Sequence, residues 1–444
     1  MNKDTIIFAV VALLFFVVAF LSHYFSREYS WWVSVESWVP WLQSWENGLW
    51  KRFVQLIHLL GWELLWGLVI LFYCKFNRAS SAFLIILTCD VVAIVVALKM
   101  LWNDPATYMD KEYIKAWACD QNTFQTPSLE VTMAAFTYSM MFYLAYDWID
   151  VIRPRIRKQV REGVLPNDEI VYEDDEDDYF LSAKSRYQSA KANDLSFWIW
   201  LSVIFFLVIM IGFSSMYLGI NSFDQVFFGM FLGYGLFCVF YFVLKDLMIE
   251  KYIIISEKMA PSSQTITGYV VHLVVVLIAL LAIRVLYYFQ VMDFTVNPKW
   301  KSEHHDLCGP LPFPSFFDKE MLFAYNFLYL NLGVMTGLVL DSLLLGGTRI
   351  DYNQTRKGEH RNEYLGLFLR LVITIVWVLL TVWLLDYLIS LLFNKWMFVL
   401  AIPYFVCGFG LFTFLKYIFQ IVGATRPEIY PIPEMSAVEL RRAD

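Results

Sequence analysis

The sequence predicts an all-α polytopic membrane protein. Of its 444 residues, 59% are hydrophobic and only 17% are charged. A soluble chain of this length could not enclose so many apolar residues in its core. Apolar runs recur along the chain, each long enough to cross a hydrocarbon core about 30 Å thick. Lys and Arg gather in alternate loops, a pattern typical of multi-pass membrane proteins. Together these observations predict about ten transmembrane helices.

The first apolar run, residues 6–21, predicts a retained signal-anchor helix. Only Lys3 and Asp4 precede it as charges, and no small-residue cleavage signal follows it. Four tryptophans then recur at spacings of seven, three and four residues: Trp31, Trp38, Trp41 and Trp45. These spacings predict an amphipathic helix over residues 29–50 that lies on the membrane surface. Lipid-facing tryptophans scattered along a loop are the alternative.

Nine further apolar runs predict the remaining membrane helices. They lie at residues 53–73, 82–101, 131–149, 196–216, 225–244, 268–290, 321–345, 366–391 and 396–422. Positive charges follow the first, third, fifth, seventh and ninth of these runs. The positive-inside rule therefore predicts both termini on the cytoplasmic or matrix side, with the endoplasmic reticulum and the inner mitochondrial membrane as alternative locations.

One acidic loop, residues 150–195, accounts for much of the net charge of -7. A solvated segment is the expected structure, and a docking strip for a basic partner is the alternative. The acidic balance gives no support for nucleic-acid binding. We therefore divide the chain into an N-terminal anchor region, a helical core that this loop interrupts, a C-terminal set of transmembrane helices and an inner-side tail. Their residues are 1–52, 53–245, 246–424 and 425–444.

Three short segments at the outer ends of predicted helices carry a recognisable pattern: residues 99–108, 126–130 and 214–229. Their order and spacing resemble the type-2 phosphatidic acid phosphatase superfamily over about residues 53–345, and the helix count looks most like its glucose-6-phosphatase branch. The family pattern reads Lys, six residues, Arg-Pro; then Pro-Ser-Gly-His; then Ser-Arg, five residues, His, three residues, Asp or Gln. The positions that match are Lys99, Pro127, Ser128, Ser214, Gln225 and Gly229.

The resemblance implies a phosphatase-like helical core whose reactive residues are missing. In the family, Lys and two Arg neutralise a phosphate, one His attacks phosphorus and the other His protonates the leaving group. Here the positions of those groups are changed: Ala106 and Thr107 replace the first Arg-Pro, Glu130 the acid His, Ser215 the second Arg and Asn221 the nucleophilic His. Losing a catalytic unit of this kind removes turnover by about a millionfold.

Lys99 and Glu130 would then define a residual pocket with Pro127, Ser128, Ser214 and Gln225. An ion pair between Lys99 and Glu130 would satisfy a charge that is expensive at membrane depth. The alternative is that Lys99 extends to the outer interface. The expected function is a catalytically inactive, structural or accessory subunit that contacts lipids and other membrane proteins. A phosphatase with an altered catalytic set is the alternative.

Other polar groups predict no cofactor. His58 and His272 are placed at opposite depths, which excludes a haem between them, and His304-His305 is expected in a polar outer loop without further metal ligands. Cys119 and Cys308 both fall on the outer side, where they form a disulfide or remain free. Interhelical ion pairs are expected for the charges inside membrane runs, with a proton or ion path as the alternative. These charges are Glu63, Asp90, Arg284, Asp341, Arg370 and Asp386.

Overall fold

The computed structural model describes residues 3–45, 47–76, 78–110, 113–117, 124–147, 195–245, 263–309, 316–344, 363–393, 397–422 and 424. Throughout these ranges the regular elements are helices, and the one extended pairing is an isolated bridge between Pro105 and Phe124. The all-α prediction is therefore confirmed. Residues 150–194 of the acidic loop and the tail 425–444 lie outside the described residues.

Seven described helices are long and apolar enough to cross a membrane: Ile6–Phe25, Ser80–Trp102, Leu195–Tyr217, Phe223–Leu244, Thr267–Met292, Phe316–Asp341 and Tyr364–Leu391. A pair bent by 44°, Gly48–Leu59 and Glu63–Lys75, raises the number to eight if it is one span. The run predicted at 396–422 is instead divided into three short helices, the second of which carries Pro403 in its first turn. Proline suits a helix start and interrupts a helix interior. The count of about ten stays a prediction.

The described helices are, in chain order, α1 (Lys3–Val33), η1 (Ser34–Trp38), α2 (Val39–Gln43), α3 (Gly48–Leu59), α4 (Glu63–Lys75), α5 (Arg78–Trp102), α6 (Thr107–Asp110), α7 (Leu129–Asp147), α10 (Leu195–Tyr217), α11 (Phe223–Phe237), η3 (Cys238–Leu244), α13 (Ser263–Asp293), α14 (Pro298–Cys308), α15 (Phe316–Leu344), α17 (Glu363–Val378), η4 (Leu379–Leu385), α18 (Asp386–Phe393), α19 (Met397–Leu400), α20 (Ile402–Phe412) and α21 (Phe414–Ile421).

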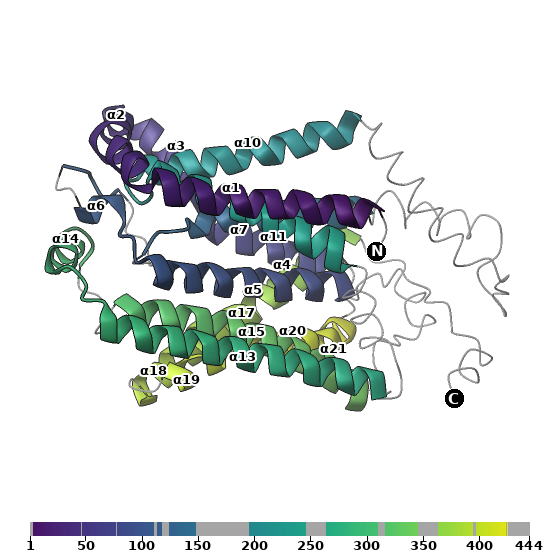
Figure 1. The fold of residues 1–444 in the computed structure, drawn as a ribbon. Helices are drawn as coiled ribbons and strands as arrows, with labels where there is room; N and C mark the ends of the chain where they lie inside the picture. The colour runs from purple at the N-terminus through teal and green to yellow at the C-terminus, as the bar shows by residue number, and fades with distance from the viewer. Residues whose placement is uncertain are drawn as a thin grey trace.

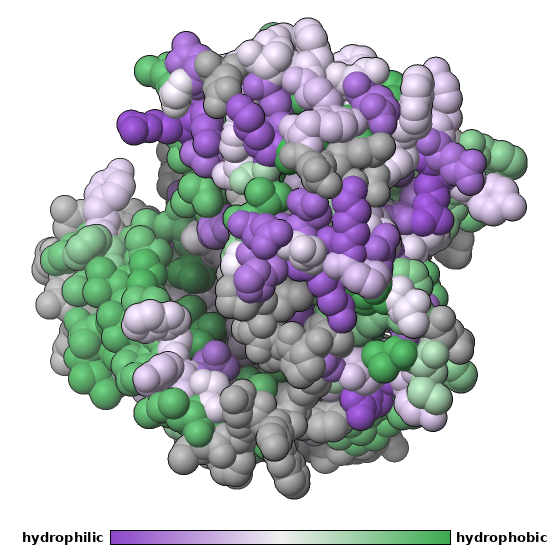
Figure 2. All heavy atoms as spheres, turned by 90° about the vertical axis from the view of Figure 1, so that its left-hand side faces the viewer, coloured by the Kyte–Doolittle hydropathy of each residue, from purple (hydrophilic) through white to green (hydrophobic). Residues whose placement is uncertain are grey.

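The long helices form two groups that α5 joins. The N-terminal group contains α1, α7, α10 and α11, and the C-terminal group contains α13, α15 and α20. Helix α5 packs against α7 on one side and against α13 and α15 on the other, and Figure 1 shows it between the two groups. The short helices α2, α6 and α14 gather at one end of the bundle (Figure 1). Viewed onto that end, hydrophilic residues cover the upper and central surface (Figure 2).

Glycine allows the closest helix contacts in both groups. A Cβ added at Gly333 of α15 would lie 2.2 Å from the carbonyl oxygen of Phe405 on α20. In the N-terminal group, a Cβ at Gly229 of α11 would lie 2.7 Å from the carbonyl oxygen of Ser128. Small residues let helix backbones approach each other in membranes. The motif glycine Gly229 therefore has a packing role that does not depend on catalysis.

The Trp-rich region differs from the single interfacial helix expected over residues 29–50. Helix α1 continues to Val33, and η1, α2 and the start of α3 follow it, with the side chain of Asn47 accepting a hydrogen bond from the Leu49 amide at 3.0 Å. The rings of Trp38, Trp41 and Trp45 contact one another in succession and all three are exposed. The aromatic stripe thus persists across a chain of short helices at the polar end of the bundle.

Candidate functional site

Backbone hydrogen bonds bring the three motif segments together. The Thr107 amide donates to the Ile220 carbonyl at 3.1 Å, which joins the first segment to the third. The Ser128 amide donates to the Gln225 carbonyl at 3.1 Å, which joins the second to the third. In addition, the side-chain amide of Gln225 donates to the Pro105 carbonyl at 3.2 Å. Residues 97 to 120 positions apart in the sequence therefore build one site.

The motif side chains lie inside the protein. The buried motif residues are Lys99, Ala106, Pro127, Ser128, Glu130, Ser214, Ser215, Asn221 and Gln225. The hydroxyl of Ser215 donates to the Gly212 carbonyl of its own helix at 2.8 Å, and that of Ser214 donates to the Ile211 carbonyl at 2.6 Å. Since both hydroxyl protons are bound to main-chain oxygens, neither serine is prepared as a nucleophile.

Both predictions for Lys99 are wrong. Its side chain is 0% exposed, so it does not extend to the interface, and its ammonium donates to Oε1 of Gln125 at 3.4 Å rather than pairing with Glu130. Glu130 instead accepts a hydrogen bond from the Ser128 hydroxyl at 3.2 Å. Its Cβ packs so closely against Gly61 that a Cβ there would lie 2.9 Å away. The start of the Glu130 side chain thus packs against the bend between α3 and α4.

Asn221, which the resemblance aligns with the nucleophilic histidine of the family, is fully buried. Neither its side-chain oxygen nor its nitrogen has a hydrogen-bond partner. The turn before it depends on Gly219, which has a φ of 82° and leaves no room for a Cβ, since that atom would lie 2.7 Å from the Lys115 carbonyl oxygen. The backbone of the turn before Asn221 is therefore tightly specified.

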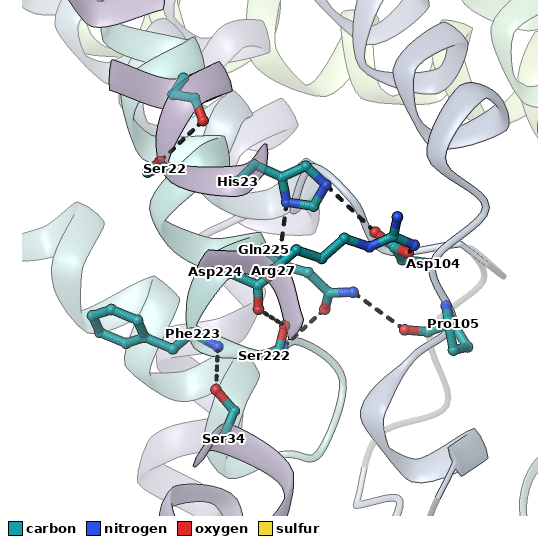
Figure 3. A network of polar contacts seen from close by, with 11 residues as sticks. Ser22, His23, Arg27, Ser34, Asp104, Pro105, Ser222, Phe223, Asp224 and Gln225 are labelled. Carbon is teal, nitrogen blue, oxygen red and sulfur yellow. Dashed lines mark hydrogen bonds and ion pairs between the residues drawn. The ribbon is translucent and has the colours of Figure 1, made fainter. Parts of the chain in front are cut away.

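Helix α1 supplies two polar residues that the sequence analysis did not place in the site, His23 and Arg27 (Figure 3). The guanidinium of Arg27 forms an ion pair with the carboxylate of Asp104. Nε2 of His23 lies 3.7 Å from Oδ2 of Asp104, and Nδ1 of His23 lies 3.5 Å from Oδ2 of Asp224. We call these four residues the outer cluster. Ser222 extends it by donating its hydroxyl proton to Oδ1 of Asp224 at 2.5 Å.

Two aromatic rings hold the His23 imidazole in place. It stacks on Phe228 at a centroid distance of 5.2 Å and meets the edge of Trp102 at 5.3 Å. The side chain is 2% exposed, and neither ring nitrogen forms a hydrogen bond. Each nitrogen faces one carboxylate. A histidine nucleophile needs one nitrogen oriented by a partner and the other free to attack, so this geometry does not prepare His23 for attack on phosphorus.

The outer cluster carries no excess of positive charge. Burial raises the pKa of the Asp104 carboxyl above its ordinary value, and the neighbouring Arg27 guanidinium opposes that rise. Asp224 adds a second carboxyl within contact of His23. With His23 protonated, two cations face two anions, and with His23 neutral the cluster is negative. Neither state provides the positive charge that a phosphate dianion requires.

Within the described residues, no group of three or more His, Cys, Asp or Glu side chains could hold a metal ion. The segment with His304 and His305 is helix α14 rather than the expected polar loop, and Asn297 caps it by accepting from the Lys299 amide at 3.0 Å. Cys308 at its end is disulfide-bonded. Its predicted partner, Cys119, lies outside the described residues.

The sequence contains a signal that could have identified His23 and Arg27 as residues of the site. His23 and Arg27 are four residues apart, so they share one face toward the C-terminal end of an otherwise apolar helix. Polar residues that recur at this spacing near membrane depth indicate a buried partner. The partners, Asp104 and Asp224, could not be identified because they follow in the chain after 77 or more residues.

One family model matches part of the chain. The model of the PAP2 superfamily, the type-2 phosphatidic acid phosphatases, matches residues 78–249. That region holds α5, α7, α10 and α11, and hence all three motif segments, whereas α1 and the C-terminal group lie outside it. No curated protein and no solved structure matches the chain. Over the matched region the chain is similar to phosphatase-like membrane proteins.

Proposed function

We propose that this chain is a catalytically inactive, phosphatase-like membrane protein that serves as a structural or accessory subunit of a membrane complex. Assignment to the glucose-6-phosphatase-like branch is part of this proposal, and the changed motif positions and the added C-terminal helices support it. The observation that carries the proposal is the outer cluster. The space beside the motif segments contains a histidine and an arginine from α1. Arg27 forms an ion pair with Asp104, and each ring nitrogen of His23 faces a carboxylate at 3.5–3.7 Å.

Three features of the site support inactivity. First, the positions of the two family histidines hold Glu130 and Asn221, and the histidine that approaches from α1 has a carboxylate at each nitrogen. Second, the one motif cation that remains, Lys99, is bound to Gln125. Third, the motif side chains are buried, so a charged substrate would have to displace protein groups before it reached them.

The contacts of His23 and Arg27 with the two carboxylates support the structural role. The ion pair and the imidazole contacts fasten α1 to the segment after α5 and to the start of α11. A framework that once bound an anion would thereby act as an internal clamp between three helices. Lipid contacts and partner subunits remain part of the proposal because the outward faces of α1, α10 and α13 are apolar and exposed.

A phosphate-release assay on the purified full-length protein tests the proposal. Phosphatidic acid and a sugar phosphate are the substrates, and His23→Gln is the matched variant because glutamine keeps a polar side chain of similar reach. We expect wild type and variant to release phosphate at the same background rate. Release by wild type that falls at least about tenfold in His23→Gln would show instead that α1 supplies an altered catalytic set.

The accessory role is tested separately by isolation in a mild detergent. We expect the chain to elute within an assembly much larger than its own mass of 52.2 kDa plus detergent. Elution as a single chain that also hydrolyses phosphate esters would overturn both parts of the proposal. Elution as a single inactive chain would overturn the accessory role alone.

A further inference from the structure

A row of polar contacts runs along the interface between α13 and α15, far from the motif site in sequence. Tyr287 donates to Oδ1 of Asp318 at 2.6 Å near the outer end. The Tyr325 hydroxyl donates to the Leu280 carbonyl at 3.4 Å one step further inward. His272 and Asn331 are bonded at 2.7 Å in the middle, and Tyr269 and Thr336 at 3.4 Å follow. We call this row the polar seam.

The polar seam has the length of a membrane core. From Tyr269 to Tyr287 it covers 18 residues of α13, which corresponds to about 27 Å of helix. The hydrocarbon core of a bilayer is about 30 Å thick. Only 11% of the apolar window of α13 is buried. The side of α13 that is covered by protein is therefore the side that carries the polar groups, whereas its exposed residues are mostly apolar.

At the centre of the polar seam, three side chains on three helices form a chain of hydrogen bonds. The amide nitrogen of Asn331 donates to Oδ1 of Asp90 on α5 at 2.6 Å. Its amide oxygen therefore faces Nε2 of His272 at 2.7 Å and accepts the imidazole proton. This orientation places the proton of the neutral imidazole on Nε2 and leaves Nδ1 able to accept another.

Asp90 has no cation beside it. The sequence predicts interhelical ion pairs for such charges, and Asp341 forms one with Lys416 of α21 at 3.0 Å. No Lys or Arg among the described residues lies within ion-pair distance of Asp90, which bonds only to the Asn331 amide. The thiol of Cys89, also on α5, is an ionisable neighbour of Asp90, and Cys407 of α20 lies near Cys89 in turn. A lone carboxylate at this depth is expensive.

One added proton neutralises the central chain. If Asp90 holds the proton, His272 is neutral, and if His272 holds it, the imidazolium compensates the Asp90 carboxylate through Asn331. Either arrangement removes the net charge, whereas loss of the proton leaves one uncompensated negative charge on Asp90. This group therefore gives up its proton most readily when another proton arrives to replace it. Simple adhesion between helices would need only neutral hydrogen bonds, such as that between Tyr269 and Thr336.

We propose that the polar seam conducts protons across the membrane, with Asp90, Asn331 and His272 as its central proton-binding site. Asp318 lies at the outer end and Asp341 at the inner end, so a carboxyl is present at each of three depths. A proton that enters beside Asp318 binds to the central site, and the same site releases one proton toward the end of α15 that carries the Asp341–Lys416 ion pair. Each cycle moves one proton and changes no other bond.

Proton flux into sealed phosphatidylcholine vesicles tests the proposal. The full chain is reconstituted into vesicles that contain potassium and a pH-sensitive dye, and valinomycin then sets an inside-negative potential. We expect wild-type vesicles to acidify faster than protein-free vesicles. Asp90→Asn keeps the size of the side chain and an acceptor for Asn331 but cannot titrate, so it should lower the flux at least about tenfold.

Two further variants separate conduction from folding. His272→Gln retains a donor to Asn331 and should also lower the flux, which covers the case in which Asp90→Asn does not fold. Asp386→Asn removes a carboxyl from α18, outside the polar seam, and should leave the wild-type flux unchanged. Wild-type flux equal to that of protein-free vesicles would overturn the proposal, as would an Asp90→Asn protein, folded by its elution profile, that conducts like wild type.

Discussion

The outer cluster and the central chain of the polar seam solve the same problem in two ways. In the outer cluster, the carboxylate of Asp104 faces Arg27 and His23, so charge is compensated by opposite charge. In the polar seam, Asp90 faces only a neutral amide, so charge is compensated by proton uptake. The difference teaches that matched groups hold helices in position, whereas an unmatched ionisable group in a membrane remains available for titration.

The largest expected effect comes from breaking the packing on which the polar seam depends. Gly333→Leu would place a Cβ 2.2 Å from the Phe405 carbonyl oxygen and push α15 away from α20. Because backbone cannot yield as a flexible side chain can, we expect a loss of unfolding free energy of about 3 kcal/mol or more. The midpoint of thermal unfolding in detergent measures it.

Gly366→Leu on α17 is the matched control for that variant. Nothing lies within 4 Å of a Cβ at Gly366, so the same substitution should leave the unfolding midpoint near that of wild type. Equal losses in the two variants would show that leucine disturbs any helix of this chain, and would remove close glycine packing as the support of the C-terminal group.

A smaller effect distinguishes the outer cluster from the polar seam directly. Arg27→Met leaves the buried carboxyl of Asp104 without its guanidinium, and we expect a loss of about 1–3 kcal/mol of unfolding free energy because Arg27 is itself partly solvated. Asp90→Asn should change the free energy by less than about 0.5 kcal/mol, since no ion pair is broken. Urea unfolding of both variants provides the measurement.

The double variant Arg27→Met/Asp104→Asn provides the internal control. If the two groups act as a pair, removing both should cost less than the sum of the single losses, because no carboxylate is left unpaired. Strictly additive losses would indicate that Arg27 stabilises α1 by packing alone. A loss in Asp90→Asn as large as that in Arg27→Met would erase the distinction between matched and unmatched groups.

The fold class could be predicted from the sequence, and so could the set of segments that build the site. Long apolar runs predict helices regardless of their partners, and the motif order predicted which segments lie together. The Lys99–Glu130 pair was wrong because Glu130 packs on Gly61, a contact that depends on the bend between α3 and α4. His23 was missed for a related reason: its partners are set by how α1 packs on α11, which periodicity within one helix does not encode.

The smallest effect concerns pH and tests the outer cluster at its carboxyl. Because the folded-state pKa of Asp104 is raised by burial above its ordinary value of about 4, the folded protein binds more protons than the unfolded chain just above that value. This contribution to stability is complete below the ordinary pKa and is lost as pH rises through the raised pKa. Arg27→Met removes the guanidinium that opposes the rise, so the loss should extend to higher pH. Unfolding midpoints measured from pH 4 upward in wild type, Arg27→Met and Asp104→Asn provide the comparison, and an identical pH dependence in all three would show that Asp104 does not titrate in the folded protein.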